Sequence, residues 1–372
     1  MSLSFKAFTE SFPLAREFRI SRGAKTQADV ITVLVSDGQY YGWGESVPYA
    51  RYNESIDSVL AQLEEIKGAF ASVCDTEDLL TLLPAGSARN TLDAALWDLK
   101  AKIKGKSVAS LANLRAVQRC YTAQTLSIDT PEGMKNQALD IKNAPLIKIK
   151  LDEHQVLERL AAIHEASPQS RLIVDANEGW QVAMLNELLP DMAKLGVALI
   201  EQPVPAEADE QLAGLNSPVI LCADESCHVS ADIERLAKYY QAVNIKLDKT
   251  GGLTEAIRAY HAAKEHNLQI MIGCMVGSSL AMAPAYGLCA DVQFVDLDGP
   301  LLVAQDRADG FTFDQYRFER LNAKTVQRWR TVQHHWMFAD HLIEDVPNFW
   351  TLFFHQFLSL LHSGRQAFGF KA

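Results

Sequence analysis

The sequence predicts an α/β fold in which a (β/α)-barrel of the modified TIM type follows an N-terminal α+β domain. From about Cys120 onward, strand-like apolar runs alternate with helical segments. Acidic or basic residues end several of these runs, at positions 175, 201, 224 and 246. Each step is about 22 to 26 residues, roughly one strand–helix unit. No GxGxxG turn opens the first unit, which favours a barrel over an open sheet.

Length and charge restrict the kind of protein. A chain of 372 residues suits a barrel of about 250 residues plus a smaller domain. The formal charge of −11, with no basic stripe, argues against a nucleic-acid partner. The longest apolar stretch, 349–361, is too short to span a bilayer, and residues 1–12 lack a signal-peptide pattern. Six scattered cysteines without a CxxC pair predict reduced thiols, so we expect a cytoplasmic protein with no membrane partner.

Residues 1–115 are predicted to form the α+β capping domain. Strands are expected up to about Trp43, with a turn at 36–38. Helices are expected from Glu54 to about Ala112, and Gly105 is a plausible helix stop. Within this stretch, apolar residues recur at helical spacing at Leu92, Ala95, Leu96, Leu99 and Ile103.

Residues 116–314 are predicted to form the barrel. Its expected strands are 122–126, 146–151, 172–175, 198–201, 219–223, 242–246, 269–273 and 294–297. Residues 315–372 form an atypical C-terminal extension, for which a packed helix, a partner-binding segment, a poorly ordered segment and a reading-frame change all stay open. A second metal site at His334 and His335 is disfavoured, because adjacent side chains rarely point to one site.

Three carboxylates each end an apolar strand candidate: Asp175, Glu201 and Asp224. In a parallel barrel these strand ends meet at one face, where like charges raise one another's pKa. A Mg²⁺ ion relieves this repulsion with all-oxygen ligands, and Mn²⁺ is a possible substitute. The alternative is that these acids are helix N-caps.

Three lysines accompany the acids. Lys148 and Lys150 lie two residues apart in a strand, so their side chains share a face. The helix-facing side would leave both charges buried and unpaired, so we expect them inside the barrel. Lys246 ends the strand that comes four strands later, so it should face Lys148 and Lys150 from the far side of the barrel mouth. Such lysines could remove and return an α-proton on both faces of a metal-held carboxylate, if nearby cations lower the pKa of the base. Alternatively, they are salt-bridge partners of the acids.

These residues resemble the enolase superfamily, whose members use a Lys or His base with Mg²⁺ to stabilise an ene-diolate. The resemblance covers about residues 1–314. The matching segments are 148–150, 175–177, 201–203, 224–226 and 246–253, and helix 93–99 is similar to the family's capping domain.

Within the superfamily, segments 273–279 and 296–300 resemble the dipeptide epimerases of the L-Ala-D/L-Glu type. The resemblance implies that Asp296 and Asp298 bind the substrate's ammonium group, although an ordinary Asp-Gly turn is the alternative. It also implies substrate contacts from Thr125 and Cys274.

The same resemblance places a cation in the loop around Arg22, where it could pair with a carboxylate on the substrate side chain. Arg19, Lys25 and Arg51 are rivals for this role.

The resemblance implies an isomerase that acts on a small dipeptide in cell-wall peptide recycling, and that could form a homo-oligomer. In this scheme Lys150 and Lys246 exchange the α-proton, Lys148 stabilises the ene-diolate, and the three carboxylates hold Mg²⁺. One rival is o-succinylbenzoate synthase or a muconate-type cycloisomerase, whose substrates lack an ammonium group. The other is a non-catalytic binding or assembly protein built on an inherited barrel.

Overall fold

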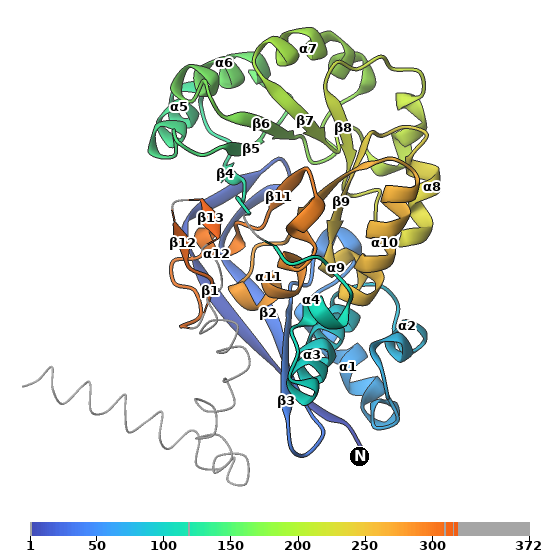
Figure 1. Cartoon of the computed structure of the whole chain (residues 1–372). Coiled ribbons are helices and arrows are strands. Elements are labelled where there is room, and N and C mark those ends of the chain that lie inside the picture. Colours follow the sequence, from blue (N-terminus) through green and yellow to red (C-terminus); the bar gives the residue numbers. More distant parts are fainter. Residues whose placement is uncertain (1, 118–119, 309, 315, 319–372) are drawn as a thin grey trace, which may run out of the picture. The chain divides into compact units, whose positions relative to one another are not determined.

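The computed structural model describes residues 2–117, 120–308, 310–314 and 316–318, and these form a capping sheet with its helices and a barrel (Figure 1). The predicted extension, including His334, His335 and the apolar stretch 349–361, lies outside the described residues except for 316–318. None of the helices in the described part of the chain is both long and apolar enough to cross a bilayer.

The capping sheet is antiparallel, in the order β1 (Ser4–Ile20), β2 (Gly23–Ser36) and β3 (Tyr41–Ser46). The predicted turn is confirmed, because the Asp37 carboxylate accepts hydrogen bonds from the backbone N–H groups of Gln39 and Tyr40 at 2.8 and 2.7 Å. The far end of the β1–β2 hairpin reaches the barrel, where Ile128 N–H donates to Arg19 O at 3.2 Å (Figure 1).

Helices cover the capping sheet. They are η1 (Ala50–Tyr52), α1 (Ile56–Phe70), η2 (Thr76–Asp78), α2 (Leu79–Leu82), α3 (Ser87–Lys104) and α4 (Val108–Leu111). Ser55 caps α1 by accepting from Ser58 N–H, and Gly105 ends α3 in the left-handed conformation (φ 61°), as predicted. Ile103, the last of the apolar residues at helical spacing, is 44% exposed because it lies at the exposed end of α3.

Helix α3 packs closely on the backbone of β3. A Cβ atom at Gly44 would lie 2.0 Å from Thr91 O, and one at Gly42 would lie 2.0 Å from Ala95 O. Only glycine permits this approach, so the helix lies directly on the sheet.

The barrel contains eight parallel strands, and each expected strand is found within two residues of its predicted bounds. They are β4 (Gln124–Leu126), β5 (Leu146–Lys150), β6 (Arg171–Asp175), β7 (Val197–Glu201), β8 (Ile220–Ala223), β9 (Ala242–Lys246), β10 (Gln269–Gly273) and β11 (Phe294–Asp296). The barrel is nearly closed, because the gap between β4 and β11 is bridged by Ala123 N–H to Val295 O at 2.8 Å rather than by a full ladder.

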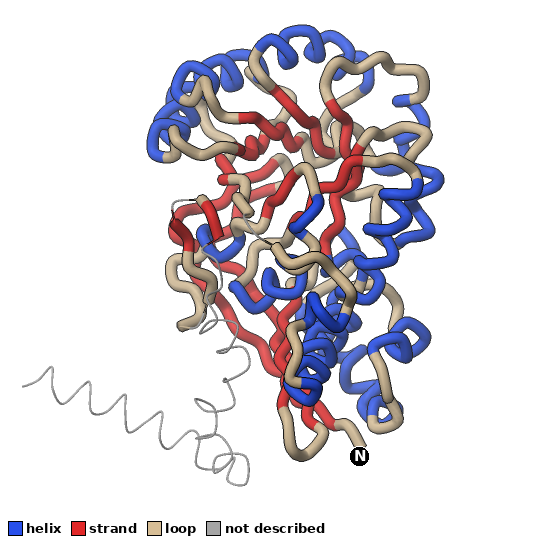
Figure 2. Tube along the Cα trace, in the orientation of Figure 1, coloured by secondary structure: helices blue, strands red, loops and turns tan. Residues whose placement is uncertain are grey.

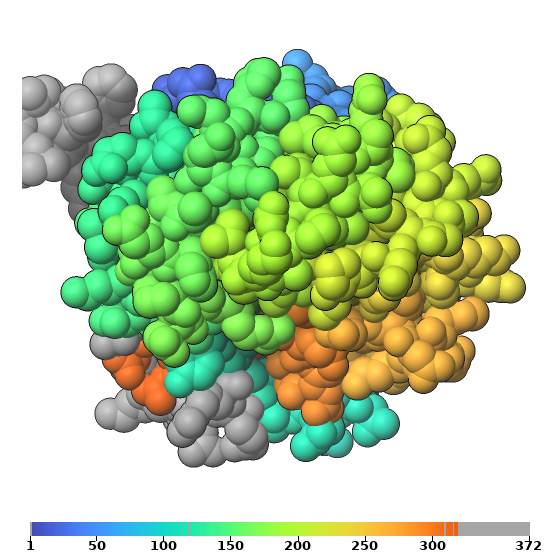
Figure 3. All heavy atoms as spheres, turned by 90° about the horizontal axis from the view of Figure 1, so that it is seen from above, coloured from blue at the N-terminus to red at the C-terminus, as the bar shows by residue number. Residues whose placement is uncertain are grey.

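Helices surround these strands (Figure 2). They are α5 (Pro131–Asp140), α6 (Val156–Ala166), α7 (Val182–Lys194), η3 (Ala206–Leu212), η4 (Ser230–Asp232), α8 (Ile233–Leu236), α9 (Leu247–Thr250), α10 (Leu253–Glu265), α11 (Ser279–Tyr286), η5 (Cys289–Asp291) and α12 (Gly299–Leu302). A short hairpin follows, formed by β12 (Phe313–Asp314) and β13 (Arg317–Phe318). Seen from above, green, yellow and orange residues follow one another across the surface, as expected when each unit packs beside the preceding one (Figure 3).

An apolar layer fills one end of the barrel interior. Each of the eight strands, or the residue just before it, contributes one side chain. It consists of Ala123, Leu146, Ile173, Leu199, Cys222, Ala242, Met271 and Phe294. All six cysteines lie among the described residues as free thiols, and four of them are buried, in line with the prediction.

Candidate active site

A polar layer lies directly above the apolar layer. Side chains two residues apart in a strand share a face, so each apolar residue places the residue two positions later inside the barrel. These residues are Thr125, Lys148, Asp175, Glu201, Asp224, Asn244, Gly273 and Asp296. The alternation of the strands therefore collects the predicted acids and Lys148 on one level, and Lys150, Lys246 and Asp298 one step further out.

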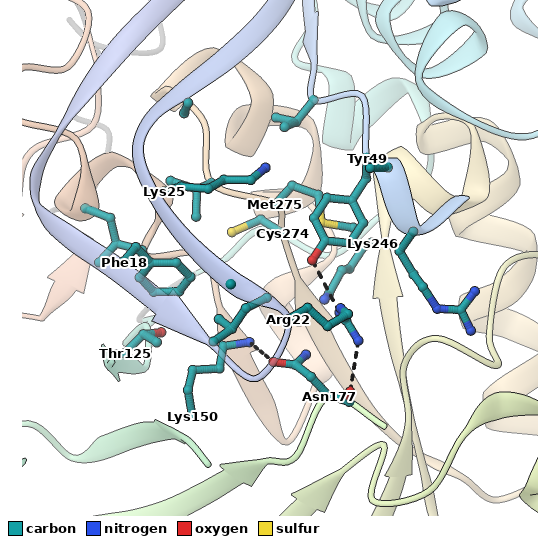
Figure 4. Close-up of a pocket in the computed structure, with 18 of the residues that line it drawn as sticks. Phe18, Arg22, Lys25, Tyr49, Thr125, Lys150, Asn177, Lys246, Cys274 and Met275 are labelled. Atoms are coloured by element: carbon teal, nitrogen blue, oxygen red, sulfur yellow. Dashed lines mark hydrogen bonds between the residues drawn. The ribbon is translucent and has the colours of Figure 1, made fainter. Parts of the chain in front are cut away.

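A pocket of about 450 Å³ opens above this level (Figure 4). The barrel contributes the charged groups of Lys148, Lys150 and Lys246 to its floor. The cap contributes its walls, which include Leu14, Phe18, Ile20, Arg22, Lys25 and Tyr49. The pocket therefore combines reactive groups from the barrel with a lid from the cap.

Lys148 is buried among carboxylates. Its Nζ lies 3.1 Å from Asp175 Oδ2, 2.7 Å from Glu201 Oε2 and 2.8 Å from Asp296 Oδ2. Burial lowers the pKa of Lys148, but the three carboxylates outweigh it and raise the pKa well above its usual value. The three carboxylates thus favour the charged form of Lys148 at the centre of the site.

Lys150 and Lys246 come from strands that lie four positions apart in the eight-strand order. Lys150 Nζ lies 2.5 Å from Asp175 Oδ2 and 3.3 Å from Asn177 Oδ1. Lys246 Nζ lies 2.6 Å from Asp224 Oδ2. Both line the pocket, as the prediction of opposed lysines requires (Figure 4).

The pKa of Lys246 differs from the expectation of a lowered value. Burial lowers it, but the carboxylates of Asp224 and Glu201 raise it well above the usual value. A lowered pKa requires a cation that neutralises these carboxylates, so the expectation depends on a bound metal ion.

Two further residues support the acids and were not singled out from the sequence. Lys249 is fully buried and donates to Asp224 Oδ1 at 2.5 Å and to Asn244 O at 3.0 Å. Asn244 donates from Nδ2 to Glu201 Oε1 at 2.9 Å. The sequence spacing could have indicated these roles, because Asn244 and Lys249 flank Lys246. It could do so only if the inward face of the strand and the turn after it were already known.

The carboxylates are buried close to one another. Burial and the neighbouring Asp175 raise the pKa of Glu201 to about 8. Glu201 Oε2 is buried and accepts no hydrogen bond, although Lys148 lies close to it. Carboxylate oxygens of this kind are the ligands that a hard divalent cation prefers.

Lysine side chains lie between the three predicted metal ligands and form ion pairs with them. Lys148 contacts both Asp175 and Glu201, while Lys246 Nζ lies 3.8 Å from Glu201 Oε1 and contacts Asp224. Among the described residues, no three acidic, histidine or cysteine side chains are close enough together to hold one metal ion in this arrangement. None of the three acids caps a described helix, so the helix-cap alternative is wrong.

The Asp-x-Asp segment borders the pocket. Asp298 Oδ2 accepts from Thr125 N–H at 2.8 Å, and burial together with Asp296 raises the pKa of Asp298 to about 7. Asp296 Oδ1 is buried and has no hydrogen-bond partner among the residues that the structure describes. Cys274 also lines the pocket, and burial, then Asp296 and Asp298, raise the pKa of its thiol well above the usual value.

Arg22 lines the pocket but is already paired. It donates to Glu225 Oε1 at 2.8 Å and to Glu178 Oε2 at 3.3 Å. It also donates to Asn177 O at 2.9 Å and lies 3.3 Å from the Tyr49 hydroxyl oxygen (Figure 4). To bind a substrate carboxylate, its guanidinium would have to exchange one of these partners.

The rival cations Arg51, Arg19 and Lys25 have other partners than Arg22 has. Arg51 is held by both oxygens of Glu178, at 2.6 Å each. Arg19 pairs with Glu17 at an exposed position. Lys25 also lines the pocket, with its Nζ 5.4 Å from the centre of the Tyr49 ring.

Two family models match the chain. The model described as "Mandelate racemase / muconate lactonizing enzyme, N-terminal domain" matches residues 3–112, and the one described as "Enolase C-terminal domain-like" matches residues 98–320. The two matches overlap at residues 98–112, which include the end of α3 and all of α4.

Similar proteins include characterised racemases and epimerases. The N-acetyl-D-glutamate racemase of a Pseudoalteromonas species is 48% identical over 286 residues, which cover 76% of this chain and 90% of that protein. The L-Ala-D/L-Glu epimerase of Escherichia coli K12 is 43% identical over 303 residues, which cover 81% of this chain and 94% of that protein.

The chain is also similar to solved structures of enolase family members and dipeptide epimerases. An enolase family member from Agrobacterium tumefaciens, with bound sodium and L-Ala-L-Glu, superposes with a TM-score of 0.84 at 42% identity, covering 87% of this chain and 99% of that one. A dipeptide epimerase from Methylococcus capsulatus, complexed with Mg and L-Arg-D-Lys, gives a TM-score of 0.80 at 29% identity, covering 86% of this chain and 97% of that one.

Proposed function

Because this chain belongs to the enolase superfamily and is an isomerase, we propose that it epimerises the second residue of a dipeptide. The observation that carries the proposal is the placement of Lys150 and Lys246 on strands four positions apart, with both ammonium groups in one pocket. Two amines that approach an α-carbon from different sides can invert it, because one removes the proton and the other returns it.

The roles of the lysines follow from their neighbours. Lys150 and Lys246 each contact one carboxylate at 2.5–2.6 Å, so each can exchange a proton with the α-carbon while its partner acid keeps it oriented. Lys148 contacts three carboxylates and stays charged, so it stabilises the negative charge that develops on the substrate's carboxylate oxygens.

Asp175, Glu201 and Asp224 would hold Mg²⁺ in this proposal. The support is the buried all-oxygen set, the raised pKa of Glu201, and the Mg present in the structure of the Methylococcus epimerase. When bound, Mg²⁺ supplies positive charge that stabilises an ionised substrate carboxylate and lowers the pKa of nearby lysines.

A free N-terminus on the substrate is favoured by Asp296. Asp296 lines the pocket, and its buried Oδ1 lacks a donor within the described part of the chain, so an ammonium group would satisfy it. The substrates of o-succinylbenzoate synthase and muconate-type cycloisomerases offer no such cation. An N-acetylated amino acid, as in the name of the Pseudoalteromonas relative, would also leave this oxygen unpaired.

Arg22 is our candidate for reading an acidic second residue, which gives L-Ala-Glu as the favoured substrate and a role in the recycling of cell-wall peptides. The glutamate in the names of two relatives supports this choice. Comparing L-Ala-L-Glu with L-Ala-L-Met as substrates of Arg22→Met tests it. A selective loss on L-Ala-L-Glu is expected, and an equal loss on both peptides would make Arg22 structural instead.

The decisive experiment follows α-proton exchange and epimerisation by NMR in D₂O with Mg²⁺. L-Ala-L-Glu should be epimerised, and N-acetyl-L-glutamate should react at least about tenfold more slowly because it lacks one charge-assisted hydrogen bond. Preference for N-acetyl-L-glutamate would make the chain an N-acylamino-acid racemase. No reaction with either compound would favour the non-catalytic alternative.

The lysine roles are tested with Lys150→Ala and Lys246→Ala. Both variants should lose epimerisation by several orders of magnitude, while each retains deuterium exchange from only one epimer. Full epimerisation by either variant would exclude the mechanism with two lysines.

A further inference from the structure

Five polar side chains from separate segments meet at the boundary between the cap and the barrel. We call them the arginine cluster: Glu10, Thr32, Glu45, Ser278 and Arg307. They come from the three strands of the capping sheet, from the residue before α11 and from the segment after α12. The cluster therefore joins the first and last thirds of the described chain.

Arg307 is the centre of the cluster. Its Nη2 donates to Glu10 Oε2 at 2.6 Å, to Thr32 Oγ1 at 3.0 Å and to Glu45 Oε2 at 2.7 Å. Its Nε donates to Ser278 Oγ at 2.7 Å. The planar guanidinium thus serves acceptors from the cap at Nη2 and an acceptor from the barrel side at Nε, and this separation of its donors is fixed by the fork geometry.

The cluster holds one wall of the pocket through Ser278. The backbone N–H of Ser278 donates to Glu45 Oε1 at 2.8 Å, and its hydroxyl donates to Glu45 Oε2. Glu45 is buried, so its charge depends on these donors and on Arg307. The residues just before Ser278 line the pocket: Cys274, Met275 and Val276.

Gly277 completes this wall. A Cβ atom there would lie 3.1 Å from Glu45 Oε1 and 3.1 Å from Val47 Cγ2. The loop therefore lies directly against Glu45, with little room to shift.

The segment that leads to Arg307 holds the opposite wall. Ala304 N–H donates to Pro13 O at 2.8 Å, and Leu14 forms a β-bridge with Val303. The guanidinium carbon of Arg307 lies 5.2 Å from the centre of the Phe12 ring. Beyond this point the hairpin lines the pocket with Leu14, Phe18, Ile20 and Arg22.

We propose that Arg307 is a positioning residue, which fixes the hairpin wall and the 274–276 wall of the pocket relative to each other and so sets substrate affinity. Its guanidinium donates to the capping sheet and to Ser278 rather than to the acids of the barrel floor, so the proton-transfer groups keep their positions without it. The inference deepens the proposed function, because the affinity concerned is that for the dipeptide.

The matched comparison uses two arginines that join the cap to the barrel. Arg307→Met should raise KM for L-Ala-L-Glu about tenfold while kcat changes by less than about twofold, because the walls but not the floor are loosened. Arg258→Met removes an exposed ion pair with Glu77 and should leave both constants unchanged. Arg307→Lys should restore part of the lost affinity.

A second variant guards against loss of folding. Arg307→Met leaves Glu45 buried without its cation, whereas Arg307→Met/Glu45→Gln removes both charges and should fold more stably. If this folded double variant has the KM of the wild type, or if KM and kcat change together in both variants, the inference is wrong.

Hydrogen–deuterium exchange tests the inference without any substrate. Backbone amides in 18–25 and 274–278 should exchange faster in Arg307→Met than in Arg258→Met, while those in β7 stay protected. Equal exchange in the two variants would overturn the positioning role. A wild type that is inactive on dipeptides would instead refute the proposed function, and the exchange result would still stand.

Discussion

Asp296 shows how one residue can serve two groups. Its Oδ2 accepts from Lys148 at 2.8 Å, while its buried Oδ1 has no donor from the described residues. A buried carboxylate oxygen that is left unpaired costs about 1–3 kcal/mol or more, so a substrate cation that binds there gains that free energy.

Asp296→Asn is expected to lower kcat/KM for L-Ala-L-Glu by roughly 10- to 100-fold, corresponding to about 1.5–3 kcal/mol for a charge-assisted hydrogen bond. The amide oxygen can still accept from Lys148, so activity on N-acetyl-L-glutamate should change little. Steady-state kinetics on both substrates measure the difference.

Asp29→Asn is the matched control, because Asp29 lines the pocket wall but its carboxylate already accepts from Ser11 and Gln27. An equal loss on the two substrates would show that Asp296 acts through Lys148 rather than on an ammonium group.

The site could be predicted from the sequence where its residues end strands at regular intervals. Lys150, Asp175 and Lys246 follow that rule, and all three lie where the spacing places them. Lys249 and Asn244 do not, because their partners are defined only once the strands are arranged in a ring. The pairing of Arg22 with Glu225 also depends on two segments about 200 residues apart, which no local pattern reveals.

At the scale of elements, the contact between α3 and β3 determines how the cap is built. The backbone of β3 approaches α3 so closely that a methyl group at Gly44 would overlap a carbonyl oxygen. Backbone atoms cannot move aside as a flexible side chain can, so this contact is sensitive to a single added carbon.

Gly44→Ala is therefore expected to lower the free energy of unfolding by about 3 kcal/mol or more. Gly68→Ala is the control, because Gly68 lies at an exposed position of α1, where an added methyl group would meet no described atom within 4 Å. It should raise the free energy of unfolding by about 0.5–1 kcal/mol through helix propensity. Urea denaturation of both variants measures the effects, and a neutral Gly44→Ala would contradict the packing described above.

Helix α3 also carries a buried acid toward the barrel. Asp93 accepts from the backbone N–H of Thr254 at 3.1 Å and from its hydroxyl, and burial raises the pKa of Asp93 to about 7. In the unfolded chain this pKa is near 3.8, so the folded state binds the extra proton between these values. The contribution of Asp93 to stability is therefore full below about pH 4 and is lost as the pH rises toward 7.

Asp93→Asn should flatten the dependence of unfolding free energy on pH between 4 and 7, by up to about 1.4 kcal/mol per pH unit. Thermal unfolding at several pH values measures the slope, with Asp57→Asn at the exposed start of α1 as the control. An unchanged slope would show that Asp93 stays ionised in the folded protein.

Most elements could be predicted from periodicity and turn residues, because each barrel strand carries its own apolar run and each turn its own polar or glycine signal. Ile103 shows the limit. Its helical spacing matches that of its buried neighbours, yet its position at the end of α3 leaves it exposed. Periodicity gives the face of a helix, but not how far its partner sheet extends.

At the scale of the described molecule, a polar ring sits inside a hydrophobic shell. Four carboxylates meet in this ring, those of Asp175, Glu201, Asp224 and Asp296, and burial together with Asp175 raises the pKa of Glu201 to about 8. Ligand binding to the folded state alone stabilises that state, so a cation that fits this ring should stabilise the whole fold.

Mg²⁺ is expected to raise the free energy of unfolding by about 2.7 kcal/mol at a concentration 100 times its Kd, and to raise the melting temperature accordingly. Glu201→Gln should abolish this response. Thermal unfolding with Mg²⁺ and with EDTA provides the measurement, and calorimetric titration gives the Kd. A wild-type melting curve that is identical in both conditions would rule out the proposed metal site.

The pairing of β1 with β2 is interrupted by a bulge beside the pocket. On β1, residues 14–17 interrupt the pairing between Pro13–Gln27 and Phe18–Lys25, next to the pocket wall. The ladder resumes beyond them, and the lysines and carboxylates of the barrel floor lie on or directly after other strands, β5 to β9 and β11. Insertions or deletions in this bulge can thus reshape the substrate chamber over evolutionary time, while the inherited proton-transfer chemistry is left untouched.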